Sequence, residues 1–320
     1  MLDVVEWMRA HNRGVPPQRQ VRFAGIDPQL CGDSVGAVAS FLARVAPERV
    51  AHFGALGVLA YARPGTRPDP NRLLLRLARS LTGFPEDHRA EFAARTTAEE
   101  ADGAVEHARM IGRAADVVTR AADPGSPQEG VLAVRDRYMA EAVARLVDAD
   151  EGEDGSERAR GGAGGGAGGA GVRVAVWAHN GHIAKDVYDG GVPALGSRLR
   201  ERYGDGYHAL GLLFGKGSFR ARRGATVQGP GVPHRMGSGR RFVESRFAAA
   251  VPGDFSVDLR AADPSSGAAR WLREPHTRRS SGAAVPRWTY RFHAAPLVPA
   301  QDDDGLAFVS HSTCSRPLPQ

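Results

Sequence analysis

Short apolar runs alternate along the chain with longer segments of helical periodicity. Apolar and β-branched runs predict strands at 21–26, 172–178, 207–214, 255–259 and 306–309. Elsewhere apolar residues recur every three or four positions, and this spacing, with a capping signal at Ser126, predicts helices at 1–13, 34–45, 127–146 and 195–203. Helices that alternate with short apolar strands favour an α/β fold with a largely parallel central sheet flanked by helices.

The segment 71–122 carries helical patterns and no convincing strand pattern. We therefore expect a helical cap at 46–126, inserted into an α/β body formed by 1–45 and 127–320. Residues 150–171 begin with acidic residues and continue as a nearly pure Gly/Ala tract. A tract of this composition buries too little apolar surface to order itself, so it predicts a flexible insertion.

Composition narrows the class of protein. The 320 residues are 42% hydrophobic and 24% charged, which is ordinary for a soluble globular protein with a sizeable core. The net charge is +6, and all of the 42 basic residues except Lys185 and Lys216 are arginine. Because these arginines are scattered, we expect no nucleic-acid partner. The chain shows no signal-peptide pattern, no apolar run of membrane-spanning length and no disulfide framework, so we expect a cytoplasmic protein without a membrane partner.

A polar turn with two histidines follows the predicted strand at 172–178. His179 and His182 stand three residues apart in this turn, and Asp27 and Gln29 follow another predicted strand. Open α/β sheets place their ligand sites just past strand ends. A histidine there can exchange protons with water near neutral pH, which suits hydrolysis of an ester. The simpler interpretation is a loop with two solvated histidines.

Two other chemistries compete with acid–base catalysis. The histidine pair could bind zinc, with a third ligand from elsewhere such as Asp27 or His311, although its spacing is not that of the His-Glu-x-x-His helix. Residues 32–36 match Gly-x-Ser-x-Gly, the nucleophile elbow of serine esterases, with Ser34 as the nucleophile. That elbow needs a strand running directly into the turn, so a helix N-cap at Ser34 explains the same residues more simply.

Several blocks of the sequence together resemble one family. The most specific block is Val176-Trp177-Ala178-His179-Asn180-Gly181-His182-Ile183, which is similar to the strand and histidine loop of the erythromycin esterase family. Further blocks that resemble this family lie at 6–12, 21–29, 135–140, 203–214 and 308–317. The resemblance therefore extends over nearly the whole chain.

The resemblance implies a metal-independent hydrolase without a cofactor, in which a cleft lies between an α/β body and a helical cap. It implies that His179 and His182 are catalytic, and that Asp27 and Gln29 line the cleft and bind substrate. The implied substrate is a small-molecule carboxylic ester or macrolide lactone, and the implied role is resistance or response to an antibiotic.

The sequence departs from the family at its start. The family's opening Gly-Glu-x-Thr-His-Gly segment, which supplies a further catalytic histidine and a glutamate, has no counterpart here. This difference predicts a chain truncated at its N-terminus and inactive as it stands, either because Met1 is an internal methionine or because the chain is a degenerate copy. A non-catalytic small-molecule-binding protein and a zinc-dependent hydrolase are the alternatives.

Overall fold

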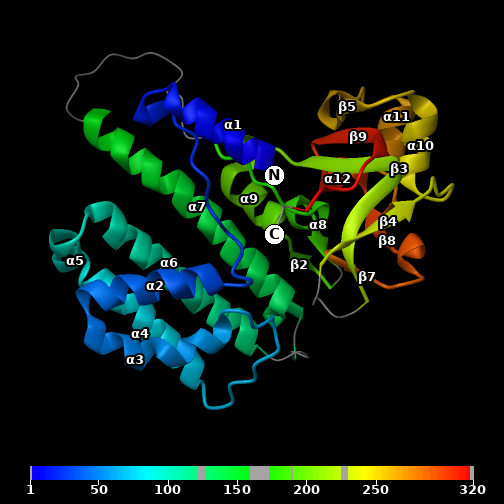
Figure 1. Cartoon of the computed structure of the whole chain (residues 1–320). Helices are drawn as coiled ribbons and strands as arrows, with labels where there is room; N and C mark the ends of the chain where they lie inside the picture. The colour runs from blue at the N-terminus through cyan, green and yellow to red at the C-terminus, as the bar shows by residue number, and fades with distance from the viewer. Residues whose placement is uncertain are drawn as a thin grey trace.

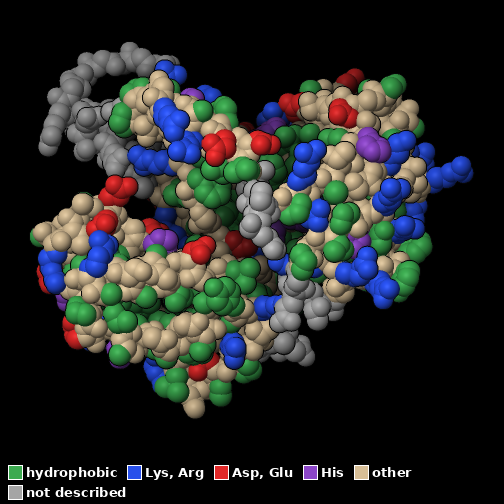
Figure 2. Space-filling model, viewed as in Figure 1, with side chains coloured by type: hydrophobic (Ala, Val, Ile, Leu, Met, Phe, Trp, Pro, Cys, Tyr) green, Lys and Arg blue, Asp and Glu red, His purple; other side chains and the backbone are tan. Residues whose placement is uncertain are grey.

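A computed structural model describes residues 2–120, 125, 127–158, 173–188, 190–224 and 230–317. Figure 1 shows a helical part and a part built around a β-sheet, with the long helix α7 (Val131–Arg158) between them. Lys and Arg side chains are spread over both parts on the face drawn in Figure 2, interspersed with Asp and Glu. No helix among the described residues is long and apolar enough to cross a membrane.

The helical part is a layered bundle. Its helices are α2 (Gly32–Val45), α3 (Pro47–Phe53), α4 (Leu73–Asp87), α5 (Arg89–Arg95) and α6 (Ala98–Thr119). The central helix α6 begins at Thr97, whose side chain accepts a hydrogen bond from the Glu100 N–H, and it packs against α2, α4 and α5. Phe41, Phe92 and Ile111 lie in the core of this part. Because α2 contributes Phe41, this core extends across the boundary expected at residue 45.

The sheet is mixed, so the prediction of a largely parallel sheet is wrong. Its strands follow the order β4 (Val232–Met236), β3 (Leu210–Arg223), β9 (Gly305–Ser312) and β5 (Phe255–Asp258), and β7 (Ala284–Val285) also pairs with β3. The β3 strand runs parallel to β9 and β7 and antiparallel to β4, while β5 is antiparallel to β9. The reason is that β4 returns along β3 without the crossover helix that a parallel neighbour requires.

Several short helices and two short strand pairs accompany this sheet in the chain. Helices α10 (Val243–Ala250) and α11 (Gly267–Leu272) contribute to the apolar core beside β3 and β9. The pairs β1 (Val187–Tyr188) with β2 (Val192–Pro193) and β6 (His276–Arg279) with β8 (Ala294–Leu297) are antiparallel. Helix α9 (Leu195–Tyr203), predicted at the same residues, packs on α7 through Leu195 and Leu199.

Two of the predicted strands do not form. Helix α1 (Leu2–Arg13) is present as predicted, but residues 21–26 and 173–178 are not in a strand, and residue 172 lies outside the described residues. No backbone group of 173–178 is hydrogen-bonded to another backbone group in the part of the chain that is described. Apolar patterning alone does not make a strand, because a strand also needs a ladder partner. Trp177 is accordingly 78% exposed and Phe23 72% exposed.

The structure describes only the first part of the predicted flexible insertion at 150–171. Residues 150–158 belong to helix α7, which continues to Arg158. Residues 159–171 lie outside the described residues. The described part of the predicted insertion is therefore helical.

Candidate active site

A buried carboxylate on α7 organises the histidine loop. Asp136 is completely buried, and it accepts hydrogen bonds from His182 Nδ1 at 2.8 Å, the Tyr188 hydroxyl at 2.9 Å and the Leu195 N–H at 2.9 Å. These donors come from α8 (Asn180–Ile183), β1 and α9. Burial, followed by the charge of Asp136, raises the pKa of Tyr188, so its hydroxyl remains a proton donor. Three donors thus stabilise one buried carboxylate.

The hydrogen bond to Asp136 sets the tautomer of His182. Because a carboxylate only accepts, the proton of a neutral His182 ring lies on Nδ1, and Nε2 carries the lone pair. The His182 side chain is 14% exposed, and Arg135 Nη1 lies 3.3 Å from Nε2. An oriented imidazole with its basic nitrogen facing away from a buried carboxylate is the arrangement of a general base.

Arg135 is held in place by Asp27. Its Nε donates to Asp27 Oδ1 at 2.9 Å and its Nη2 donates to Oδ2 at 2.6 Å, while the Gln29 N–H also donates to Oδ1 at 3.1 Å. Burial raises the pKa of Asp27, but the hydrogen bond and charge of Arg135 more than offset this, and the pKa is lowered overall. This two-point contact leaves Nη1 of Arg135 directed at His182.

His179 has the opposite hydrogen-bonding role. Its Nδ1 accepts the Gly181 N–H at 3.1 Å and so caps α8, which places the proton of the neutral ring on Nε2. The residue is exposed, but the protein atoms around its ring, followed by the charges of Arg278 and His182, lower its pKa. At neutral pH His179 is therefore a neutral hydrogen-bond donor.

The loop that carries both histidines is tied to the sheet. The Asn180 side chain donates to the Leu212 carbonyl at 2.8 Å and accepts the Leu212 N–H at 3.1 Å. Leu212 lies on β3, where it pairs with Ala307. The amide thus takes the place of a strand neighbour at this position of β3.

The structure brings three of the predicted site residues into one network. His182, Asp27 and the backbone of Gln29 meet through Arg135, and His179 lies three residues before His182 on the same loop. Sequence reasoning missed Asp136, Arg135 and Tyr188 as members of this network. A signal for Asp136 was present, because it lies three residues before Met139 on the apolar stripe of α7, where a charged residue needs a partner.

The alternative chemistries find less support. Among the described residues no group of three His, Cys, Asp or Glu side chains is arranged to hold a metal ion. Ser34 lies in the first turn of α2, not at the end of a strand, and its hydroxyl is 3.1 Å from His107 Nδ1. The predicted N-cap at Ser34 is wrong, because α2 begins at Gly32 and Cys31 occupies the cap position.

Comparisons with known proteins agree on the family. The family model for erythromycin esterase matches residues 1–312, and no curated protein matches the sequence. A solved structure of a protein from Bacillus cereus has a TM-score of 0.66 and 17% identity, with 98% of this chain and 72% of that chain covered. A succinoglycan biosynthesis protein has a TM-score of 0.64 and 17% identity, covering 98% of this chain and 70% of that one.

A mutant of the erythromycin esterase EreC in its open conformation also matches. Its TM-score is 0.62 at 14% identity, and the match covers 97% of this chain and 72% of that chain. At these identities the three structures show the fold alone. The family model spans nearly the whole sequence, including the histidine loop and the α7 residues of the network described above. The chain therefore belongs to the erythromycin esterase family.

Proposed function

We propose that this protein hydrolyses a carboxylic ester or a macrolide lactone by general acid–base catalysis at His182. The observation that carries this proposal is the Asp136–His182 pair, with a fully buried carboxylate 2.8 Å from Nδ1 of the imidazole. The negative charge of Asp136 stabilises the imidazolium that forms when His182 takes a proton. Family membership supports ester hydrolysis as the reaction class.

The proposed reaction begins when a water molecule takes the place of Arg135 Nη1 at Nε2 of His182. The water transfers one proton to Nε2 while its oxygen attacks the ester carbonyl carbon, and the carbonyl oxygen becomes an oxyanion. The C–O bond to the alkoxide then breaks, and the leaving oxygen takes the proton back from His182. The products are a carboxylic acid and an alcohol, and the protein returns to its starting state.

Two groups are suited to stabilise the oxyanion. Arg135 presents Nη1 beside His182, and its only contact there is the long 3.3 Å approach to Nε2. His179 on the same loop has a neutral Nε2–H donor that faces the Ser281 backbone, and it would have to turn from there to the oxyanion. Preorganised donors of this kind typically contribute a hundredfold or more to the rate, roughly 3 kcal/mol each. Asp27 then acts as a positioning residue for Arg135, and Gln29 is the proposed substrate contact beside it.

We also propose that additional strand-forming chain completes the site. The support is the unpaired backbone of 173–178 together with the exposed side chains of Trp177 and Phe23. A strand that pairs with residues 173–178 would satisfy those backbone groups and would bring a further acid–base residue next to the histidine loop. We further propose that the substrate is a small-molecule ester or a macrolide lactone. We also propose that the protein acts in antibiotic resistance and is located in the cytoplasm.

The test uses the 320-residue chain and a version extended upstream of Met1. Each is incubated with a macrolide and a panel of simple esters, and products are followed by mass spectrometry for the gain of one water. We expect turnover that is lost in His182→Ala and kept in His311→Ala, a matched histidine variant on β9. Turnover by the extended version alone would assign part of the catalytic set to the added segment.

Other outcomes separate the alternatives. Saturable binding of the macrolide without turnover by either version would favour a non-catalytic binding protein. Turnover that a chelator abolishes and zinc restores would favour a metal site at the histidine pair. Turnover that survives in His182→Ala would contradict the proposed base.

A further inference from the structure

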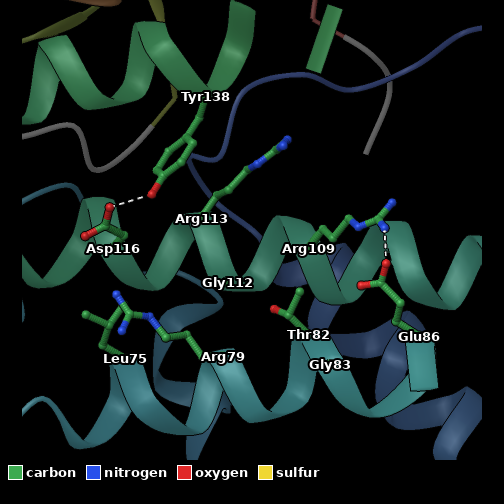
Figure 3. A pocket seen from close by; sticks show the side chains of 10 residues that line it. All are labelled: Leu75, Arg79, Thr82, Gly83, Glu86, Arg109, Gly112, Arg113, Asp116 and Tyr138. Atoms are coloured by element: carbon green, nitrogen blue, oxygen red, sulfur yellow. Dashed lines mark hydrogen bonds and ion pairs between the residues drawn. The ribbon is translucent and has the colours of Figure 1, made fainter. Parts of the chain in front are cut away.

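Several arginines of this chain are neutralised by carboxylates. In the pocket between α4, α6 and α7, Arg109 donates to Glu86 at 2.7 Å (Figure 3). In the candidate active site, Arg135 donates to both carboxylate oxygens of Asp27. A guanidinium with such a partner is satisfied within the protein. An arginine that is buried without one is costly for the fold, so its environment points to a ligand that accepts its hydrogen bonds.

Arg278 on β6 is an arginine of this second kind. It is 7% exposed, and its Nη1 is buried and has no hydrogen-bond partner. Its side chain forms neither a hydrogen bond nor an ion pair with any residue that the structure describes. Its neighbour Arg279 is equally buried, but it donates to the carbonyls of Gly215 at 2.8 Å and Gly237 at 2.7 Å and lies 3.6 Å from Glu244. One strand therefore carries a guanidinium that the fold holds and another that it leaves free.

The free guanidinium belongs to the surroundings of the histidine loop. Neighbouring residues of a strand point to opposite faces, so Arg278 points away from β3, which Arg279 contacts. The His179 ring meets the backbone of Ser281, three residues beyond Arg278. Burial, followed by the charge of Arg278, lowers the pKa of His179, and the same charge acts on Tyr188. The positive charge of Arg278 therefore reaches the candidate active site from the sheet side.

Two acidic residues near Arg278 do not take up its donors. They lie at the end of α12 (Pro299–Asp302), which contacts the histidine loop where the Lys185 N–H donates to the Asp302 carbonyl at 2.9 Å (Figure 1). Burial raises the pKa of Asp302 and that of Asp303, the latter to about 7, and the charge of Arg278 offsets part of each rise. Neither carboxyl accepts a hydrogen bond from Arg278 in the described part of the chain. Its donors therefore stay available to an anion in the site.

We propose that Arg278 binds the reacting carboxyl group of the substrate. It donates hydrogen bonds to the ester carbonyl oxygen as that oxygen becomes an oxyanion, and afterwards to the carboxylate of the acid product. This proposal rests on the hydrolysis proposed at His182 and adds a third, sheet-borne donor to it. Arg135 already spends two of its nitrogens on Asp27, whereas the whole fork of Arg278 is free to match two carboxylate oxygens. A desolvated, preorganised donor stabilises developing charge more strongly than a solvated one.

The first experiment measures binding and needs no turnover. Benzoate, a carboxylate with an apolar group, is titrated into the full chain by calorimetry, against chloride at equal ionic strength. We expect saturable binding, with the Kd raised by about tenfold to a hundredfold in Arg278→Met and by less in Arg278→Lys, which keeps the charge but loses the fork. Arg260→Met removes an exposed arginine paired with Asp258 and should leave the Kd unchanged. Benzoate binding no stronger than chloride, or an unchanged Kd in Arg278→Met, would overturn the proposal.

The second experiment separates a catalytic role from a structural one. With an ester that the wild type hydrolyses, Arg278→Met should lower kcat by about a hundredfold or more. Its Tm should fall less than that of Arg279→Met, because only Arg279 loses hydrogen bonds to backbone carbonyls. An equal fall in Tm would assign Arg278 a structural role and contradict the proposal.

The two proposals fail in different ways. A normal kcat in Arg278→Met together with a kcat lost in His182→Ala would refute the role of Arg278 and keep the hydrolysis. Benzoate binding that depends on Arg278 in a chain that hydrolyses no ester would support the carboxylate site and count against the hydrolysis.

Discussion

The buried carboxyl of Asp303 predicts an unusual pH dependence of stability. Asp303 follows α12 (Pro299–Asp302), is completely buried, and neither of its side-chain oxygens has a hydrogen-bond partner among the described residues. Burial raises its pKa from 3.8 to about 7, and the positive charge of Arg278 only partly opposes this. We expect Asp303→Asn to stabilise the protein at pH 8.

The magnitude follows from proton linkage. Between the two pKa values the folded state holds a proton that the unfolded state has lost, so the stability of the wild type falls as pH rises from about 4 to about 7. A shift of roughly three units corresponds to a cost of about 4 kcal/mol above pH 7. Asn carries no such cost, although its amide also lacks partners, which subtracts a penalty of about 1–3 kcal/mol that does not depend on pH.

The assay is urea unfolding of both proteins at pH 5 and pH 8. The difference in unfolding free energy between Asp303→Asn and wild type should grow by about 3 kcal/mol from the lower to the higher pH. The fixed amide penalty cancels in this comparison. A difference that is independent of pH, or that falls toward pH 8, would refute the reasoning, since it would mean that Asp303 is ionised at little cost.

Asp304, the next residue, is a control for which we expect the opposite dependence of stability on pH. Asp304 accepts the Lys185 ammonium at 2.7 Å and the Ala209 N–H at 2.9 Å. Burial raises the pKa of Asp304, but the Lys185 contact more than offsets this, so the pKa is lowered overall. The stabilisation from Asp304 is therefore present above the unfolded pKa and lost on acidification through the folded pKa. Asp304→Asn should destabilise the protein at pH 8, and the effect should fade in acid.

Three further outcomes test the site and the helical core. If His182 is the base proposed above, Asp136→Asn should lower kcat by at least about a hundredfold, since an amide cannot hold the same tautomer of the His182 imidazole. An unchanged kcat would exclude the proposed pair. Ser34→Ala should leave turnover unchanged, and a fluorophosphonate probe should not label Ser34 in the wild type; labelling there would favour the serine-esterase alternative. Gly112→Ala should lower the Tm by an amount equivalent to about 1–3 kcal/mol, because a Cβ there would lie 2.7 Å from Thr82 Oγ1. The control is Gly103→Ala on the same helix, which meets no atom within 4 Å and should not destabilise the protein. Equal effects of the two substitutions would contradict the close approach at Gly112.

The sequence by itself determined the helices and the family. Helical periodicity marked α1, α2 and α9 within a residue or two of their ends, because these helices depend on contacts within a few turns and on one apolar face. The histidine block carried the resemblance to the erythromycin esterase family, and the family model confirms it over residues 1–312. The sequence also pointed to His182 and Asp27, which the structure links through Arg135.

Only the tertiary structure decided the sheet and the chemistry of the site. An apolar run does not specify the direction of its neighbour, so the mixed order around β3 and the unpaired segment at 173–178 followed from long-range pairing. In the same way, Asp136 is one acidic residue of a long helix until folding buries it against His182 and Tyr188. Its role arises from the loss of water around a charge, and that loss depends on segments far apart in the chain.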